Sequence, residues 1–96
     1  MDQQFTRHAQ IRSQQRGIPL RISEMLLAYG EEHFDGHGAV IRYFSRRSRQ
    51  YLRDDLGAEA VRRLSEHLRA YLVQNAHDGV IITVGLRHPN KRGYQH

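Results

Sequence analysis

An apolar run near the end of the chain, residues 80–86 (VIITVGL), places the strongest constraint on how this sequence folds. Its β-branched residues favour an extended strand, and its near-continuous apolar content is typical of a strand that is covered on both faces. Asp78 and Gly79 directly before it form a turn signal. The sequence therefore predicts a central C-terminal strand inside a thin structure of two layers.

Two helices are expected before any strand. The first, residues 4–16, combines good helix formers with a thin apolar face, and Gly17 is its natural end. The second begins with Pro19, which suits a first helical turn, and ends at Gly30. Its apolar residues recur at i, i+3, i+4 and i+7, the spacing of a helix packed on a core: Ile22, Met25, Leu26 and Tyr29.

The period of the pattern changes after Gly30. The segments EEHFD and AVIRYF flank a Gly-His-Gly turn at residues 36–38, which predicts an antiparallel hairpin. In an extended second strand, alternate side chains point to opposite faces. One face then carries Ala39, Ile41 and Tyr43, and the other carries Val40, Arg42 and Phe44.

Two further helices are predicted between the hairpin and the last strand. One begins near Ser45, a good N-cap residue, and stops at Gly57. The other, about residues 58–75, is expected to be the longest and sets one apolar stripe at helical spacing: Val61, Leu64, Leu68, Tyr71 and Leu72. The predicted fold class is α+β, with residues 1–96 as a single domain and residues 87–96 as a basic extension.

The charge balance points to an anionic partner. The net charge is +5, and all but one of the 15 basic residues are Arg, the exception being Lys91. Arginine can bind a phosphate or a carboxylate with two parallel hydrogen bonds, so the excess of Arg over Lys suits an anionic partner. A genome that favours arginine codons would produce the same excess. The chain has no Cys, which excludes disulfides and thiolate chemistry. The polar N-terminus and the short apolar runs predict a cytoplasmic protein with no membrane partner.

Several basic side chains are candidates for binding a nucleic acid. His8, Arg12 and Arg16 are four residues apart on the first helix, so their side chains share one face, and such a row of cations can bind a phosphate backbone. The basic helix after the hairpin offers a second such surface. Either surface is also explained as an ordinary solvated helix face. The full candidate set is His8, Arg12, Arg16, Arg42, Arg46, Arg47, Arg49 and Lys91.

The residues after the last strand are candidates for catalysis. Cleavage of a phosphodiester without a metal needs a cation to stabilise the charged transition state and a group to take the 2'-hydroxyl proton. Arg87 and Arg92 suit the first role, and His88 or Tyr94 suits the second. A merely solubilising basic tail is the alternative. No cofactor or metal is expected. Gly36 and Gly38 make the geometry of the alternating residues His33, Asp35 and His37 loose, and no further ligand is evident.

Both ends of the chain carry a resemblance to a known family. The segments HAQIRSQQRGIP and DGVIITVGLRH resemble a family of small bacterial domains of unknown function, which is itself similar to the BrnT and RelE group of toxins. The resemblance implies a small α+β fold, RNA cleavage without a metal, and neutralisation by a partner antitoxin. It places His8, Arg12 and Arg16 in the N-terminal pattern. Arg87 corresponds to a phosphate-binding Arg and Tyr94 to a terminal catalytic Tyr, although Pro89, Asn90 and Gly93 lengthen the spacing between them.

Two functions from different classes remain open at this point. The first is an RNA-binding, metal-independent endoribonuclease of the toxin-antitoxin type. The second is non-catalytic. It is either a module that binds RNA, an acidic protein such as an antitoxin, or a nucleoprotein complex through its Arg-rich surfaces, or a regulator or inhibitor module that binds a partner protein through them. Charge and periodicity do not separate them, because binding and catalysis use the same cations and differ only in placement.

Overall fold

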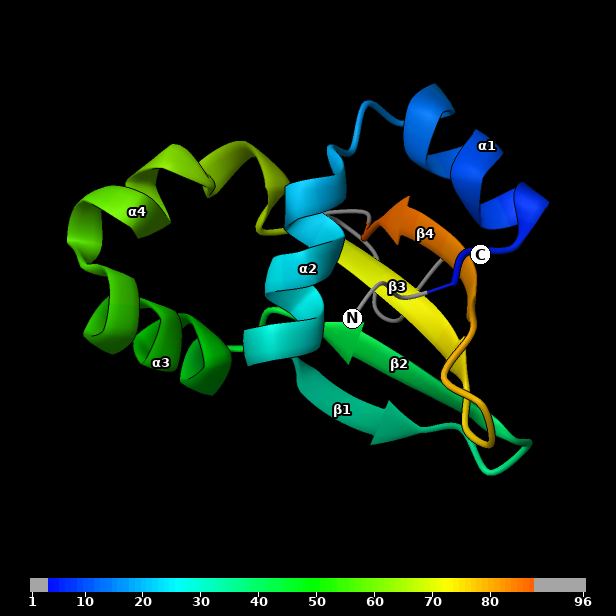
Figure 1. The fold of residues 1–96 in the computed structure, drawn as a ribbon. Helices are drawn as coiled ribbons and strands as arrows, with labels where there is room; N and C mark the ends of the chain where they lie inside the picture. Colours follow the sequence, from blue (N-terminus) through cyan, green and yellow to red (C-terminus); the bar gives the residue numbers. More distant parts are fainter. Residues whose placement is uncertain (1–3, 88–96) are drawn as a thin grey trace.

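Strands of this chain form one antiparallel sheet in the order β1-β2-β3-β4, and helices cover one of its faces (Figure 1). The computed structural model describes residues 4–87. Within them the predicted α+β class is confirmed. The elements are α1 (Arg7–Gln15), α2 (Leu20–Tyr29), β1 (Glu31–Phe34), β2 (Ala39–Tyr43), α3 (Arg46–Leu56), α4 (Ala58–Arg63), a 3-10 turn (Ser65–His67), β3 (Ala70–Asn75) and β4 (Ile81–Leu86).

Helix α1 begins three residues later than the sequence predicts, because residues 4–6 are extended and lie beside β4. The backbone of Thr6 donates to the carbonyl of Ile81 at 2.9 Å, and Ile81 donates to the carbonyl of Gln4 at 2.9 Å. The Thr6 hydroxyl then accepts from the amide of Ala9 at 3.1 Å and donates to the carbonyl of Ile82 at 3.0 Å. One side chain thus caps α1 and fastens it to β4.

The predicted hairpin and the helix after it are confirmed. In β1 and β2, Glu31 pairs with Tyr43 and Phe34 with Val40. The carboxylate of Asp35 accepts from the amide of His37 in the turn at 2.6 Å and from the amide of Ala39 at the start of β2 at 3.1 Å. Ser45 caps α3 by accepting from the Ser48 amide at 3.0 Å. The helix ends at Gly57, whose φ of 92° suits only a residue without a side chain.

The prediction of one long helix over residues 58–75 is wrong. Helix α4 stops at Arg63, and Ala70–Asn75 forms β3, which pairs with β2 on one side and β4 on the other. Side chains of residues 70–74 are buried on both faces of the sheet. This segment therefore lacks the two-residue alternation of apolar and polar residues that indicates a strand in a sequence. Since β2 and β3 occupy the centre of the sheet, β4 is last in the strand order and not central as predicted.

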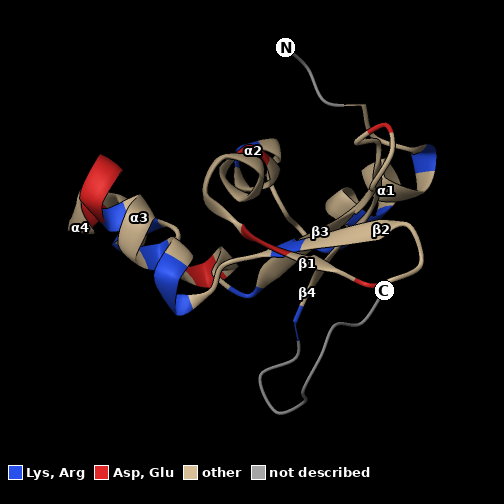
Figure 2. Cartoon of the chain, turned by 90° about the horizontal axis from the view of Figure 1, so that it is seen from below, with Lys and Arg blue, Asp and Glu red and all other residues tan. Residues whose placement is uncertain are grey.

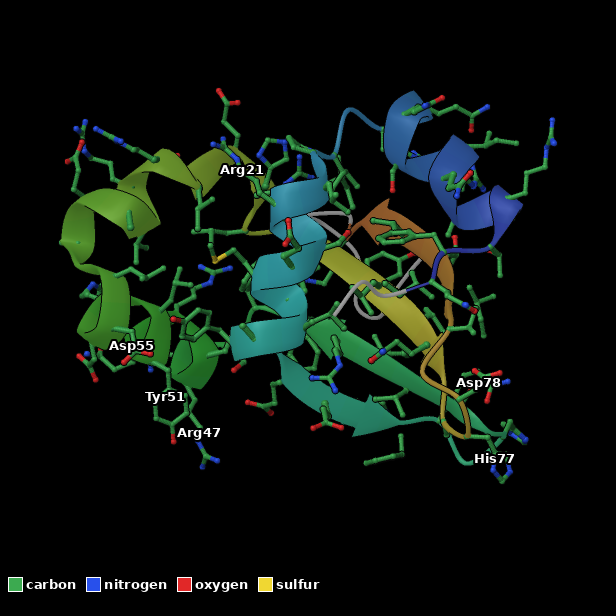
Figure 3. The ribbon with its side chains drawn as sticks, in the orientation of Figure 1. Arg21, Arg47, Tyr51, Asp55, His77 and Asp78 are labelled. Carbon is green, nitrogen blue, oxygen red and sulfur yellow. The ribbon has the colours of Figure 1, made fainter. Side chains whose placement is uncertain are left out.

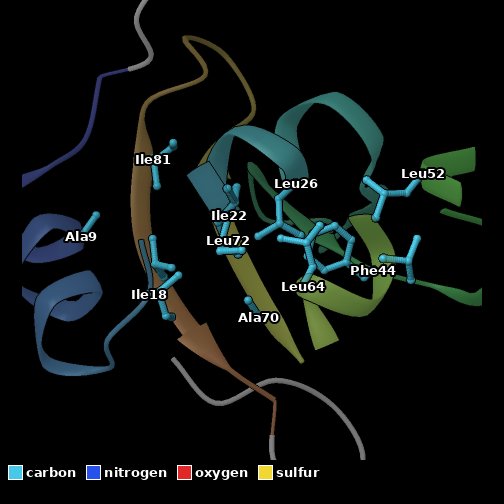
Figure 4. Close-up of a cluster of buried hydrophobic side chains, with 12 residues drawn as sticks. Ala9, Ile18, Ile22, Leu26, Phe44, Leu52, Leu64, Ala70, Leu72 and Ile81 are labelled. Atoms are coloured by element: carbon cyan, nitrogen blue, oxygen red, sulfur yellow. The ribbon is translucent and has the colours of Figure 1, made fainter. Parts of the chain in front are cut away.

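The main hydrophobic core lies between the sheet and the helices. Figure 4 shows Ile22 and Leu26 of α2 directed toward Leu72 of β3, with Phe44 and Leu52 continuing the cluster toward α3 and α4. All five side chains are at most 1% exposed. Full burial of each contributes about 1.5–3 kcal/mol, which fixes the position of α3 relative to the sheet. No helix within residues 4–87 is long and apolar enough to cross a membrane.

Candidate functional site

Helix α3 presents three different faces to its surroundings. Ser48 and Leu52 are buried against the core. Arg47 and Tyr51 point away from the rest of the fold, as Figure 3 shows. Between these two faces lies a polar face whose members recur at i, i+3, i+4 and i+7: Arg46, Arg49, Gln50 and Arg53. Because residues at this spacing share one side of a helix, three guanidinium groups gather there.

This polar face forms one wall of an open pocket of about 600 Å³. Arg87, the residue that follows β4, also lines this pocket, and Figure 2 shows basic residues both along α3 and at this end of β4. We call it the arginine pocket, and its lining residues are Phe44, Ser45, Arg46, Arg49, Gln50, Arg53 and Arg87. No carboxylate belongs to this set, so the described part of the lining is cationic.

Arg87 is held in the arginine pocket by contacts from two sides. Its amide donates to the carbonyl of Arg69 at 2.7 Å, and the Arg69 guanidinium donates to the Arg87 carbonyl at 3.2 Å. The guanidinium carbon of Arg87 lies 5.8 Å from the centroid of the Tyr43 ring, within the range of a cation–π interaction. The backbone of Arg87 is therefore held by Arg69, and its guanidinium lies over the Tyr43 ring.

Arg49 is the most constrained cation of the arginine pocket. Its Nη2 donates to the carbonyl of Leu68 at 3.4 Å, while its buried Nε has no hydrogen-bond partner among the described residues. Burial lowers the pKa of Arg49, and the nearby charge of Arg87 lowers it further. A buried donor without a partner costs about 1–3 kcal/mol. An anion bound in the pocket would offset the repulsion between Arg49 and Arg87.

A small network joins the start of α3 to the sheet beside the arginine pocket. The Glu31 carboxylate accepts from the Ser45 hydroxyl at 2.7 Å and from the Tyr43 hydroxyl at 3.1 Å. These hydrogen bonds, together with the charge of Arg47, hold the pKa of Glu31 below its usual value. The network positions the N-terminus of α3, where the helix dipole also favours an anion.

The structure separates the predicted binding residues into distinct locations. Arg46, Arg49 and Arg87 come together in the arginine pocket. Arg42 lies on the helix-covered face of the sheet, where its guanidinium donates to the Gln74 side chain at 2.5 Å and to the Leu27 carbonyl at 3.4 Å. Its donors are thus used inside the fold.

The cations of α1 lie away from the arginine pocket, since α1 and α3 are at opposite ends of the molecule (Figure 1). His8 and Arg16 are exposed, and Arg12 is half-buried. Burial raises the pKa of Tyr71, and the nearby charges of Arg16 and Arg12 oppose this shift in part. The predicted row is therefore a second basic surface, close to β3.

Sequence reasoning missed several residues of the arginine pocket, namely Ser45, Gln50 and Arg53. The helical spacing of Arg46, Arg49, Gln50 and Arg53 was the available signal, because it applies to polar residues as well as to apolar ones. The predicted residues His88, Lys91, Arg92 and Tyr94 lie outside the described residues. Over residues 4–87, no three His, Asp or Glu side chains are placed to hold a metal ion.

Comparison of the chain with protein-family models, with curated proteins and with solved structures finds no match. The geometry of the site is therefore the structural ground for a functional proposal.

Proposed function

We propose that this protein binds RNA and holds a phosphate of the strand in the arginine pocket. The single observation that carries the proposal is the convergence of Arg49 and Arg87 with two further arginines around a space that no described carboxylate lines. Guanidinium groups recognise phosphate with paired hydrogen bonds, and such contacts supply much of the affinity of proteins for nucleic acids. The motif resemblance to RNA-cleaving toxins supports the same class of ligand.

Cleavage of the bound RNA without a metal is the activity that this site would serve. Arg87 belongs to the arginine pocket and also to the predicted catalytic set, and its place suits stabilisation of charge on a phosphate. His88 follows it directly in the chain, and Tyr94 is the other proposed proton acceptor. The proposed activity is a metal-independent endoribonuclease of the toxin-antitoxin type.

A protein-binding module is the second candidate, and a separate surface favours it. An open, largely apolar pocket of about 710 Å³ lies between α1 and α2. Its lining includes Phe5, Ile18, Leu20 and Leu27, and Leu20 is 62% exposed. Exposed apolar surface of this kind often marks a contact with another protein, and an antitoxin is the partner that the motif resemblance implies.

The test measures the binding of a labelled single-stranded RNA by fluorescence anisotropy in EDTA. Arg49→Gln and Arg87→Gln are each expected to weaken binding about 10-fold, the effect of losing a hydrogen bond to a charged group. Arg62→Gln is the matched control, because it removes the same charge from an exposed side chain on α4 that pairs with Glu59. Equal losses in all three variants would show only general charge attraction and contradict a specific pocket.

The same reactions, resolved on a gel, test the proposed cleavage. Products ending in a 2',3'-cyclic phosphate that are lost with His88→Ala or Tyr94→Ala would support the ribonuclease. Intact RNA bound at the arginine pocket would limit the function to binding.

A further inference from the structure

We infer that the arginine pocket selects a terminal phosphate of an RNA strand over the phosphates inside the strand. The inference rests on the proposed RNA binding and adds which chemical group enters the pocket. Three properties of the site lead to it: the amount of positive charge around one space, the anchored position of Arg49, and a core residue at the inner side of the pocket.

The charge of the arginine pocket exceeds what one internal phosphate offsets. An internal phosphodiester carries a single negative charge and two free oxygens. A terminal phosphomonoester carries about −1.5 to −2 charges at neutral pH and three acceptor oxygens. Each guanidinium has five N–H donors, and four arginines line this space. Attraction to every arginine grows with the charge of the ligand, whereas the repulsion among the arginines stays the same, so the terminal group is favoured.

Arg49 is anchored at one side of this space. Its Nη2 donates to the Leu68 carbonyl at 3.4 Å, and its Nε is buried. The charge of Arg49 therefore stays beside a ligand in the pocket. Three free oxygens on one phosphorus can meet Arg49, Arg87 and the α3 arginines together better than two.

A core residue, Phe44, lies at the inner side of the arginine pocket. Phe44 lines it and is only 1% exposed, because its ring packs in the main hydrophobic core. Arg49 is held beside it by α3 and by the Leu68 carbonyl. An end of a strand can enter with its phosphate first. An internal phosphate has to bring a nucleotide on each side into the same space, which keeps it farther from Arg49.

The experiment compares labelled RNAs of one sequence that differ only at their ends: both ends hydroxyl, a 5'-phosphate, or a 3'-phosphate. Binding is measured by anisotropy with the full chain in EDTA, and adenosine monophosphate serves as a free-nucleotide competitor. At least one phosphorylated RNA is expected to bind about 10-fold more tightly than the hydroxyl-ended RNA, the gain of one added charge-assisted contact. Arg49→Gln is expected to abolish this preference and Arg62→Gln to keep it.

The outcomes separate this inference from the proposed function. If all three RNAs bind equally, and Arg49→Gln and Arg87→Gln weaken each of them, RNA binding at the pocket stands and the terminal-phosphate inference is overturned. If none of the RNAs binds, both fall. If adenosine monophosphate binds as tightly as the phosphorylated RNA, the assignment to RNA ends is overturned in favour of a free nucleotide. Preservation of the fold in Arg49→Gln is checked by circular dichroism.

Discussion

Replacement of Gly85 by alanine tests the packing that supports the end of β4. A Cβ at this position would lie 2.8 Å from the Tyr71 hydroxyl oxygen and 3.0 Å from two carbons of its ring. Gly85 is not among the glycines with positive φ, so alanine meets no obstacle in the backbone itself. The whole effect of Gly85→Ala is therefore expected to arise from these close contacts.

The magnitude follows from how little Tyr71 can move. Its side chain is fully buried and packs with Ile41 and Val73 on the second face of the sheet. Ordinary van der Waals contact needs about 3.5–4.0 Å, so the ring or the strand must shift by several tenths of an ångström or more. Overpacking of this kind costs about 1–3 kcal/mol. In a domain of this size, each kcal/mol lowers the midpoint of thermal unfolding by about 4–8 °C.

Urea unfolding followed by circular dichroism measures the effect, and a double-mutant cycle identifies its source. In a Tyr71→Leu background the ring that meets the new methyl group is absent, so Gly85→Ala should cost about 1 kcal/mol less than in the natural chain. A loss below about 0.5 kcal/mol in the natural background, within the usual range of a neutral substitution, would refute the packing argument. An equal loss in both backgrounds would trace the effect to something other than Tyr71.

Three further predictions concern α3, the hairpin and α1. Arg49→Gln is expected to leave the urea midpoint unchanged or raised while RNA affinity falls, because folding disfavours the charged Arg49; a lowered midpoint would contradict this. The pKa of Glu31 is lower in the folded protein than its usual value of 4.5, so the charged carboxylate stabilises the fold at any pH above 4.5. This stabilisation is lost as the pH falls through the pKa that Glu31 has in the folded protein. Glu31→Gln should therefore melt below the natural chain at neutral pH and together with it in acid, whereas a gap that persists in acid would exclude the ionic cause. Thr6→Ala should cost about 1–2 kcal/mol in urea unfolding, because the cap of α1 and the bond to Ile82 are lost together; an unchanged midpoint would show that α1 needs neither.

Local chemistry in the sequence determined the elements whose signals lie close together along the chain. Helix α2 follows from the spacing of Ile22 and Leu26, and α3 follows from a capping serine at one end and a glycine at the other. The hairpin follows from alternating residues around a glycine turn. In each case the residues that define the element are within a few positions of one another, so short-range preferences suffice.

Tertiary contacts decided the state of residues 70–75. Leu64, Leu68 and Leu72 keep a four-residue spacing that favours a helix, yet Tyr71 and Leu72 are buried on opposite faces of β3. Pairing with β2 and β4 satisfies the backbone of this segment on both edges. Such pairing depends on strands far away in the chain, and no local pattern records it.

In the candidate site, too, some features follow from the sequence alone and others only from the tertiary structure. The sequence by itself determined that α3 carries its arginines on a capped helix and that Arg87 follows an apolar strand. Only the tertiary structure decided that Arg87 and Arg49 line the same pocket, whereas Arg42 is engaged inside the fold and the α1 cations lie at the other end of the molecule. Composition fixes how many charges a chain has, but packing of α3 and β4 around a common core fixes which of those charges meet.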